Sequence, residues 1–252
     1  MGFLAAEAGL SRDLFAGFSA LFGKIRGGVA MAAIGACAGF GAVSGSSIAT
    51  ASTMSKVSLP ELRKLKYDDG LATGALAAGG TLGILIPPSV ALVIYAIVVE
   101  GSIIEMFQAA VLPGFLAVVF FIFVIWLRVH LNPELAPKAK VLSKIERNEA
   151  LWRLVPVLLI FGTIIMGLGI GLFTPTPAAA MGVLVILLYG FISRFFSQTY
   201  LTLSKLRNSI LSTAKTAGMI YFILFAADVL KGFFARSGLP VALTDLVANS
   251  GF

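Results

Sequence analysis

Four long stretches of this 252-residue chain contain no charged side chain. Each is longer than the ~20 residues that a helix needs to cross the hydrocarbon core of a membrane, and they cover residues 27–55, 71–99, 106–127 and 154–193. Charged residues make up only 12% of the chain, against about 25% in a soluble domain. The stretches lack the alternating pattern of barrel strands, and lipid offers no partner for unpaired backbone groups. We therefore predict an all-α integral membrane protein.

The basic residues indicate how this protein is oriented. We predict five spans, at residues 71–99, 106–127, 154–173, 178–193 and 209–230. Lysine and arginine concentrate in the connecting segments 52–70, 128–153 (which includes Lys138 and Lys140) and 194–208, whereas 100–105 and 173–177 have none. The positive-inside rule places the basic segments in the cytoplasm. The net charge of +7 is thereby explained by membrane orientation, and we predict no nucleic-acid partner.

The run 27–55 does not fit this alternation, because basic residues stand at both of its ends, at Arg26 and Lys56. A segment that starts and ends on one side of the membrane is a re-entrant hairpin, which we place at residues 27–56. Its centre reads GAVSGSS, rich in residues that end helices, and we predict the tip at Ser44–Ser47. An ordinary span with a glycine-rich packing face is the alternative. Non-helical backbone at membrane depth must be buried or line a cavity, which indicates a site.

A second break is predicted inside the span 71–99. Pro87 and Pro88 remove two amide donors and disfavour helical geometry in the preceding residue. The break would free carbonyl groups around Gly83–Ile86 and expose the amino end of a half-helix starting near Pro88, groups that suit a cation and an anion respectively. Asp68 and Asp69 precede the helix and are expected to favour its amino end. A purely structural proline kink is the alternative reading.

Three motifs in this order carry a family resemblance: GSSIATASTM (45–54), LPELRKLKYDDGLATGALAAGGTLGILIPPS (59–89) and FQAAVLPG (107–114), followed by GLFTPTPAAAMG (171–182). They resemble the large permease subunit of tripartite ATP-independent periplasmic (TRAP) transporters, DctM-type. The resemblance implies an elevator-type fold with two inverted repeats, each with one hairpin and one broken helix. It further implies a multi-pass protein of the bacterial or archaeal inner membrane.

The resemblance also implies a function and partners. Such a subunit takes up a small carboxylate, dicarboxylates among them, with sodium as the coupling ion and no other cofactor. A small TRAP membrane subunit and a periplasmic solute-binding protein would be its partners. Carried over by motif, the implied sodium site comprises Ser44, Gly45, Ser46, Ser47, Gly83, Ile86 and Pro87. The implied substrate site comprises Ser46, Ser47, Thr81, Pro88 and Ser89.

The domain organisation follows from the same resemblance. Residues 1–252 form one permease domain: a first repeat at 1–127, a cytoplasmic loop at 128–153 and the start of a second inverted repeat at 154–252. Because the resemblance implies a second hairpin and a second broken helix after Phe252, and further helices before Met1, we expect the chain to be an internal fragment. The chain departs from the family pattern at Ser55, where glycine is common, and at Pro177, where glutamate is common.

Three other functions fit parts of this pattern. Another ion-coupled elevator-type anion transporter would use the same two breaks. A membrane-embedded hydrolase would need a base near Ser46, and no histidine or lysine stands at a suitable depth. A channel would not need a substrate-sized site framed by a hairpin and a broken helix. We therefore predict a transporter and not an enzyme.

Overall fold

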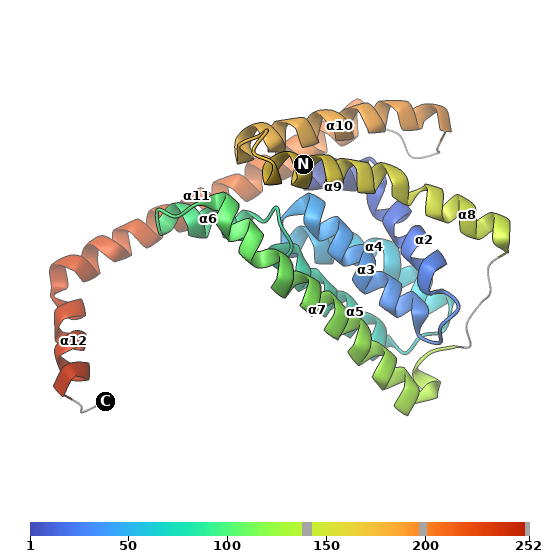
Figure 1. The fold of residues 1–252 in the computed structure, drawn as a ribbon, viewed down its shortest axis with the longest axis horizontal. Helices are drawn as coiled ribbons and strands as arrows, with labels where there is room; N and C mark the ends of the chain where they lie inside the picture. The colour runs from blue at the N-terminus through green and yellow to red at the C-terminus, as the bar shows by residue number, and fades with distance from the viewer. Residues whose placement is uncertain (138–142, 197–200, 250–252) are drawn as a thin grey trace. The chain divides into compact units, whose positions relative to one another are not determined.

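The computed structural model describes residues 1–137, 143–196 and 201–249, which fold into helices joined by turns, with no strand among them (Figure 1). The prediction of an all-α fold is confirmed. The helices are α1 (Gly2–Glu7), α2 (Leu10–Phe22), α3 (Gly28–Ser44), α4 (Ser47–Lys64), α5 (Asp69–Leu85), α6 (Val90–Val98), α7 (Ile103–Leu131), the 3-10 helix η1 (Pro133–Leu135), α8 (Lys144–Trp152), α9 (Leu154–Gly169), α10 (Pro175–Phe196), α11 (Leu203–Ser237) and α12 (Leu239–Asn249).

Three helical segments of the described chain are long and apolar enough to cross a membrane: Ile103–Leu131, Lys144–Gly167 and Leu203–Ser237. A fourth crossing is possible through α5 and α6 together, which bend by 42° at their break. The predicted span 178–193 falls in a shorter apolar helix, Thr176–Ile192. The lengths support a multi-span protein, and the number of passes stays a prediction.

The chain divides into two compact units, Met1–Leu206 and Arg207–Phe252. The second unit contains most of α11 and all of α12. Large apolar side chains of α11, such as Met219, Phe222 and Phe225, are exposed on its surface. Such exposure would be costly in water, and it is normal for a helix whose solvent is lipid. The predicted span 209–230 lies in this helix.

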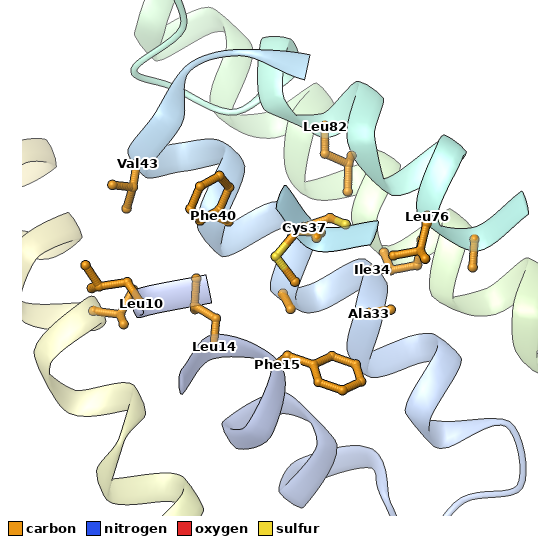
Figure 2. Packing of buried hydrophobic residues seen from close by; sticks show 14 of the residues in the cluster. Leu10, Leu14, Phe15, Ala33, Ile34, Cys37, Phe40, Val43, Leu76 and Leu82 are labelled. Atoms are coloured by element: carbon orange, nitrogen blue, oxygen red, sulfur yellow. The ribbon is translucent and has the colours of Figure 1, made fainter. Parts of the chain in front are cut away.

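The core of the first unit is built around α3, which contacts α2, α4, α5 and α7. Figure 2 shows Ile34, Cys37 and Phe40 of α3 between side chains of α2 and of α5. All three are fully buried, and Gly35 and Gly41 are buried as well. A helix that is apolar all round is enclosed either by protein or by lipid, and the burial of these residues inside the protein decides for the former. The first arm of the predicted hairpin is therefore enclosed by other helices.

Hydrogen bonds at the base of the hairpin fix it against the start of α5. The Asp68 side chain caps α5 by accepting from the Leu71 amide at 2.9 Å, which confirms the predicted capping role of this residue. The Tyr67 hydroxyl accepts from the Val29 amide at 3.3 Å. The Asp68 amide donates to the carbonyl of Leu135, so the segment after α7 also reaches this base. The hairpin and the broken helix thus have a common anchor.

The segment predicted as the cytoplasmic loop 128–153 contains more structure than expected. The helix α7 continues to Leu131, and α8 begins after a capping box in which Ser143 and Glu146 exchange hydrogen bonds with each other's backbone. The pattern serine-x-x-glutamate at 143–146 is the local signal of such a start. We predicted a loop here because charged residues are concentrated in this segment. Lys138 and Lys140 lie outside the described residues.

Candidate functional site

The turn between α3 and α4 lies where the hairpin tip was predicted. Gly45 ends α3 in the left-handed region, with φ of 64°, a conformation that glycine adopts without strain. Ser46 is extended, and its hydroxyl caps α4 by accepting from the Ala49 amide at 3.3 Å. Ser47 is half-buried at the first position of α4. Glycine followed by a capping serine therefore explains why the helix ends and restarts here.

Hydroxyl groups cluster on the inner side of this turn. The Oγ of Ser44 lies 2.8 Å from Oγ1 of Thr50 and 3.4 Å from the carbonyl oxygen of Ser46. Thr50 lies one turn into α4 and is completely buried. Sequence analysis did not select Thr50; the signal available was its i+4 spacing from Ser46, which places it beneath the turn. The tip thus offers a set of neutral oxygen atoms in protein interior.

The break between α5 and α6 occupies residues 86–89, as the two prolines predict. Pro87 has no N–H group, so the carbonyl of Gly83 loses the partner that a continuous helix would give it. Pro88 likewise removes the helical partner of the Ile84 carbonyl. That carbonyl accepts from the Ser89 hydroxyl at 2.8 Å instead. Ser89, only 1% exposed, also caps α6 by accepting from the Leu92 amide. The break is therefore stabilised by its own side chains and leaves the Gly83 carbonyl without its helical partner.

The hairpin turn and the break lie directly against each other. The Val90 amide donates to the carbonyl of Gly45 at 3.0 Å. On the α5 side, a Cβ atom placed on Gly83 would lie 2.6 Å from both the Ser46 carbonyl oxygen and Oγ1 of Thr50. A Cβ atom placed on Gly41 would lie 2.8 Å from the Cα of Gly83. Glycine at these positions is what allows the two backbones to approach so closely.

A cavity of about 280 Å³ opens beside this junction. Ser44 and Gly45 line it from the hairpin, and Pro88 and Ser89 line it from the break. Its remaining walls come from Met1, which precedes α1, and from α1, α3, α6, α7, α9 and α10, at Gly2, Val43, Val90, Val93, Ile94, Phe107, Ile164, Ala178 and Ala179. Segments far apart in the sequence therefore enclose one space, and its lining includes the two serines Ser44 and Ser89.

Most of the predicted site residues meet at this junction, whereas the side chains of Ile86 and Thr81 lie elsewhere. Ser44, Gly45, Ser46 and Ser47 form the turn, and Gly83, Pro88 and Ser89 lie against it or line the cavity. Pro87 is buried in the break, and Ile86 lies beside Gly114 of α7. Thr81 is exposed, and its hydroxyl donates to the carbonyl of Ala78 in its own helix. The structure does not bring Thr81 to the cavity.

The chemistry of this junction suits a cation better than a helix-terminus anion site. The first amide of α6, that of Val90, is occupied by Gly45, and the Ser89 hydroxyl occupies the amide of Leu92. No group of three or more His, Cys, Asp or Glu side chains able to hold a metal ion occurs in the described part of the chain. A cation here would therefore be bound by neutral hydroxyl and carbonyl oxygens, the ligands that hard, weakly held cations accept.

Comparison with known proteins agrees with the resemblance noted in the sequence. The family described as "Tripartite ATP-independent periplasmic transporter, DctM component" matches residues 1–251. The chain is 31% identical to the C4-dicarboxylate TRAP transporter large permease protein DctM of Rhodobacter capsulatus, over 99% of the chain and 59% of that protein. Identity is 32% to the protein of the same name from Pseudomonas aeruginosa, over 99% of the chain and 57% of that protein.

A third relative is named after a different compound. The chain is 34% identical to the ectoine/5-hydroxyectoine TRAP transporter large permease protein UehC of Ruegeria pomeroyi, over 82% of the chain and 46% of that protein. The chain therefore spans less than two thirds of the length of these curated relatives. The prediction of a transporter component rather than an enzyme is confirmed by these matches. The chain belongs to the DctM family of TRAP transporter large permease components.

Proposed function

We propose that this chain carries a sodium site and part of the substrate pocket of a sodium-coupled transporter that takes up a small carboxylate. The observation that supports this most directly is the junction between the hairpin turn and the break, where the Val90 amide donates to the Gly45 carbonyl. Two breaks in apolar helices that meet at one point are the arrangement by which transporters hold ions and substrates within a membrane.

The proposed sodium ligands are oxygens of the turn and the break. We assign them to Ser44, Gly45, Ser46 and Ser47 of the turn and to Gly83, Ile86 and Pro87 of the break, and we add Thr50 because its hydroxyl lies 2.8 Å from that of Ser44. Neutral oxygens bind sodium without a carboxylate, so the ion is released readily when the site opens. The proposed substrate contacts are Pro88 and Ser89, which line the cavity, together with Ser46, Ser47 and Thr81, which are assigned by motif alone.

The proposed partners and location follow from family membership. We infer that the chain acts in the bacterial or archaeal inner membrane as a multi-pass protein. A small TRAP membrane subunit would pack beside it, and a periplasmic solute-binding protein would deliver the carboxylate. The relatives' names give C4-dicarboxylates and ectoine as transported compounds, so the family name alone leaves the compound open.

Sodium binding tests the proposal without requiring transport. The chain is reconstituted in lipid nanodiscs, and the broadening of the sodium NMR line is titrated against sodium, with empty nanodiscs as the blank. We expect saturable broadening in the wild type that lithium displaces and potassium does not. In the variant Ser46→Ala we expect at least a tenfold weaker affinity, because an oxygen ligand is lost while the apolar volume barely changes.

Ser102→Ala is the matched control. Both serines cap a helix, since Ser46 accepts from the Ala49 amide and Ser102 accepts from the Glu105 amide. Loss of a cap destabilises a helix by about 1 kcal/mol in either case, so only the Ser46 variant should lose sodium affinity. Equal sodium affinity in the two variants would remove the turn from the cation site. Absence of saturable broadening in the wild type would contradict sodium coupling at this junction.

A further inference from the structure

One side of α4 is polar, although this helix is the second arm of the predicted hairpin. Ser52 and Lys56 are exposed and lie one helical turn apart. Thr50 and Met54, which precede them by two residues, are buried, and the Thr50 hydroxyl lies 2.8 Å from that of Ser44 in α3. Because residues two apart lie on opposite sides of a helix, Ser52 and Lys56 are on the side of α4 away from α3.

The exposed side of α5 is also on the side away from α3. A Cβ atom placed on Gly79 would lie 2.8 Å from Sγ of Cys37 in α3, whereas Thr81, two residues further along α5, is exposed. A Cβ atom placed on Gly80 would lie 2.6 Å from the Cβ of Ala51 in α4. The exposed sides of the two helices therefore form one surface. We call it the outer face, and its residues are Ser52 and Lys56 of α4 and Thr73, Ala77 and Thr81 of α5.

Lipid is an unfavourable neighbour for the outer face. The exposed residues of the apolar helix α7 include large hydrophobic side chains such as Leu112, Phe115 and Phe120, which suit lipid. The outer face instead carries the ammonium group of Lys56, about 12 Å along the helix axis from Lys64 at the end of α4. A lysine side chain that faces hydrocarbon is strongly unfavourable. Water is therefore the neighbour that this surface suits.

Lys56 gives the outer face a positive charge. Arg63, nearer the end of α4, is paired with Asp69 at 2.8 Å. No acidic residue occurs in the sequence at 47–60 or at 70–99, so neither helix supplies an acid beside Lys56 toward the hairpin turn. In water on this surface, Lys56 would attract anions.

We propose that the outer face lines a water-filled route along which an anion passes between the predicted cytoplasmic side and the hairpin turn, with Lys56 as the residue that attracts it. The inference rests on the proposed carboxylate transport, because the carboxylate is the anion concerned. Toward the turn, this surface ends at the exposed apolar side chains of Ile48 and Ile84. The proposed route therefore leads to the last helical turn before the junction.

The access of reagents to an introduced thiol tests this inference on the chain in lipid nanodiscs. Cys37, the single cysteine of the sequence, is first replaced by alanine, and Ser52→Cys then places a thiol on the outer face. Val119→Cys, at an exposed position of α7, is the lipid-facing comparison. Each thiol is treated with two methanethiosulfonates, one carrying a sulfonate group and one a trimethylammonium group. We expect the thiol of Ser52→Cys to react about a hundredfold faster than that of Val119→Cys, because the reactive thiolate forms in water.

Charge selection is tested by removing the Lys56 ammonium group. The measured quantity is the rate with the sulfonate reagent divided by the rate with the trimethylammonium reagent. Adding Lys56→Gln to Ser52→Cys should lower this ratio about fivefold, since Lys56 lies one helical turn from position 52. Lys56→Arg should preserve the ratio. Lys144→Gln is the control, because it removes the same charge from an exposed residue of α8, which contacts α2 and α9, and the ratio should then stay unchanged.

Two results would overturn the inference. If the thiol of Ser52→Cys reacts as slowly as that of Val119→Cys, lipid or another protein segment covers the outer face. If the ratio is the same in Lys56→Gln and Lys144→Gln, Lys56 does not attract the anion. Sodium binding at the junction is measured separately, so either result leaves the proposed sodium site standing. Absence of sodium binding would instead refute the proposed function without changing the reactivity of these thiols.

Discussion

The backbone amide of Val90 donates to the carbonyl oxygen of Gly45 across 3.0 Å. This bond joins the first residue of α6 to the turn between α3 and α4, which lie 45 residues apart in sequence. A continuous helix through residues 85–90 would direct the Val90 amide to the carbonyl of Ile86. The break therefore makes available the donor that holds the hairpin turn in place, and the two irregular segments stabilise each other.

Gly83 should be far less tolerant of substitution than Gly74, although both lie in α5. In Gly83→Ala the new methyl group would meet the Ser46 carbonyl and the Thr50 hydroxyl at 2.6 Å, and overpacking of this kind costs about 1–3 kcal/mol. In Gly74→Ala nothing lies within 4 Å of the new methyl group, so better helix propensity should stabilise the protein by about 0.5–1 kcal/mol. Thermal unfolding in detergent measures both, and an equal effect at the two positions would contradict the close approach.

The double variant Pro87→Ala/Pro88→Ala should fold and lose sodium binding. Alanine restores two amide donors and favours the helix, so the carbonyls of Gly83 and Ile84 would regain helical partners and the Val90 amide would leave Gly45. We expect normal thermal stability in detergent together with at least a tenfold weaker sodium affinity by NMR. A stable double variant with wild-type sodium affinity would show that the prolines only bend a helix.

Thr50→Val should weaken both the turn and the sodium site. The substitution keeps the branched shape, removes the hydroxyl and leaves Ser44 without its 2.8 Å partner, at a cost of about 1 kcal/mol or more for a buried group. Sodium affinity should fall, and Thr50→Ser should restore most of it. Thr163→Val is the control, because the exposed Thr163 hydroxyl only donates to Leu159 of its own helix. Identical sodium titrations for Thr50→Val and Thr163→Val would exclude Thr50 as a ligand.

The contact between Asp13 of α2 and Tyr189 of α10 should make stability depend on pH. Burial raises the pKa of Asp13, and the hydrogen bond from Tyr189 at 2.8 Å lowers it in part. Because the folded-state pKa lies above the unfolded value of about 3.9, the protonated form favours folding. This contribution is complete below about pH 3.9 and is lost as pH rises through the folded-state pKa.

Asp13→Asn mimics the protonated form and can still accept from Tyr189. We expect its melting temperature to exceed that of the wild type by a margin that grows from pH 4 to pH 7. Tyr189→Phe removes the donor and should destabilise the protein at pH 7 by about 1–3 kcal/mol, with a smaller effect near pH 4. Differences between wild type and variants that stay constant across this range would show that Asp13 does not change its charge there.

Several features could be predicted from the sequence because they depend on short segments alone. The length and apolarity of runs such as 106–127 require helices in a membrane. The missing amides of Pro87 and Pro88 require a break whatever surrounds them. Gly45 followed by Ser46 carries the local signals for ending one helix and capping the next, and Asp68 carries the signal for starting α5. In each case the deciding energy term acts within one or two helical turns.

Only the tertiary structure decided which of these local features meet. The Gly45 turn contacts the break because Gly41 and Gly83 lack side chains and let α3 and α5 approach closely. The burial of Thr50, the exposure of Thr81 and the place of Ile164 in the cavity wall likewise depend on how the helices pack in the folded protein. Local sequence patterns do not specify such contacts, because they depend on the combined shape of helices that are remote in the chain and fit together only in the folded protein.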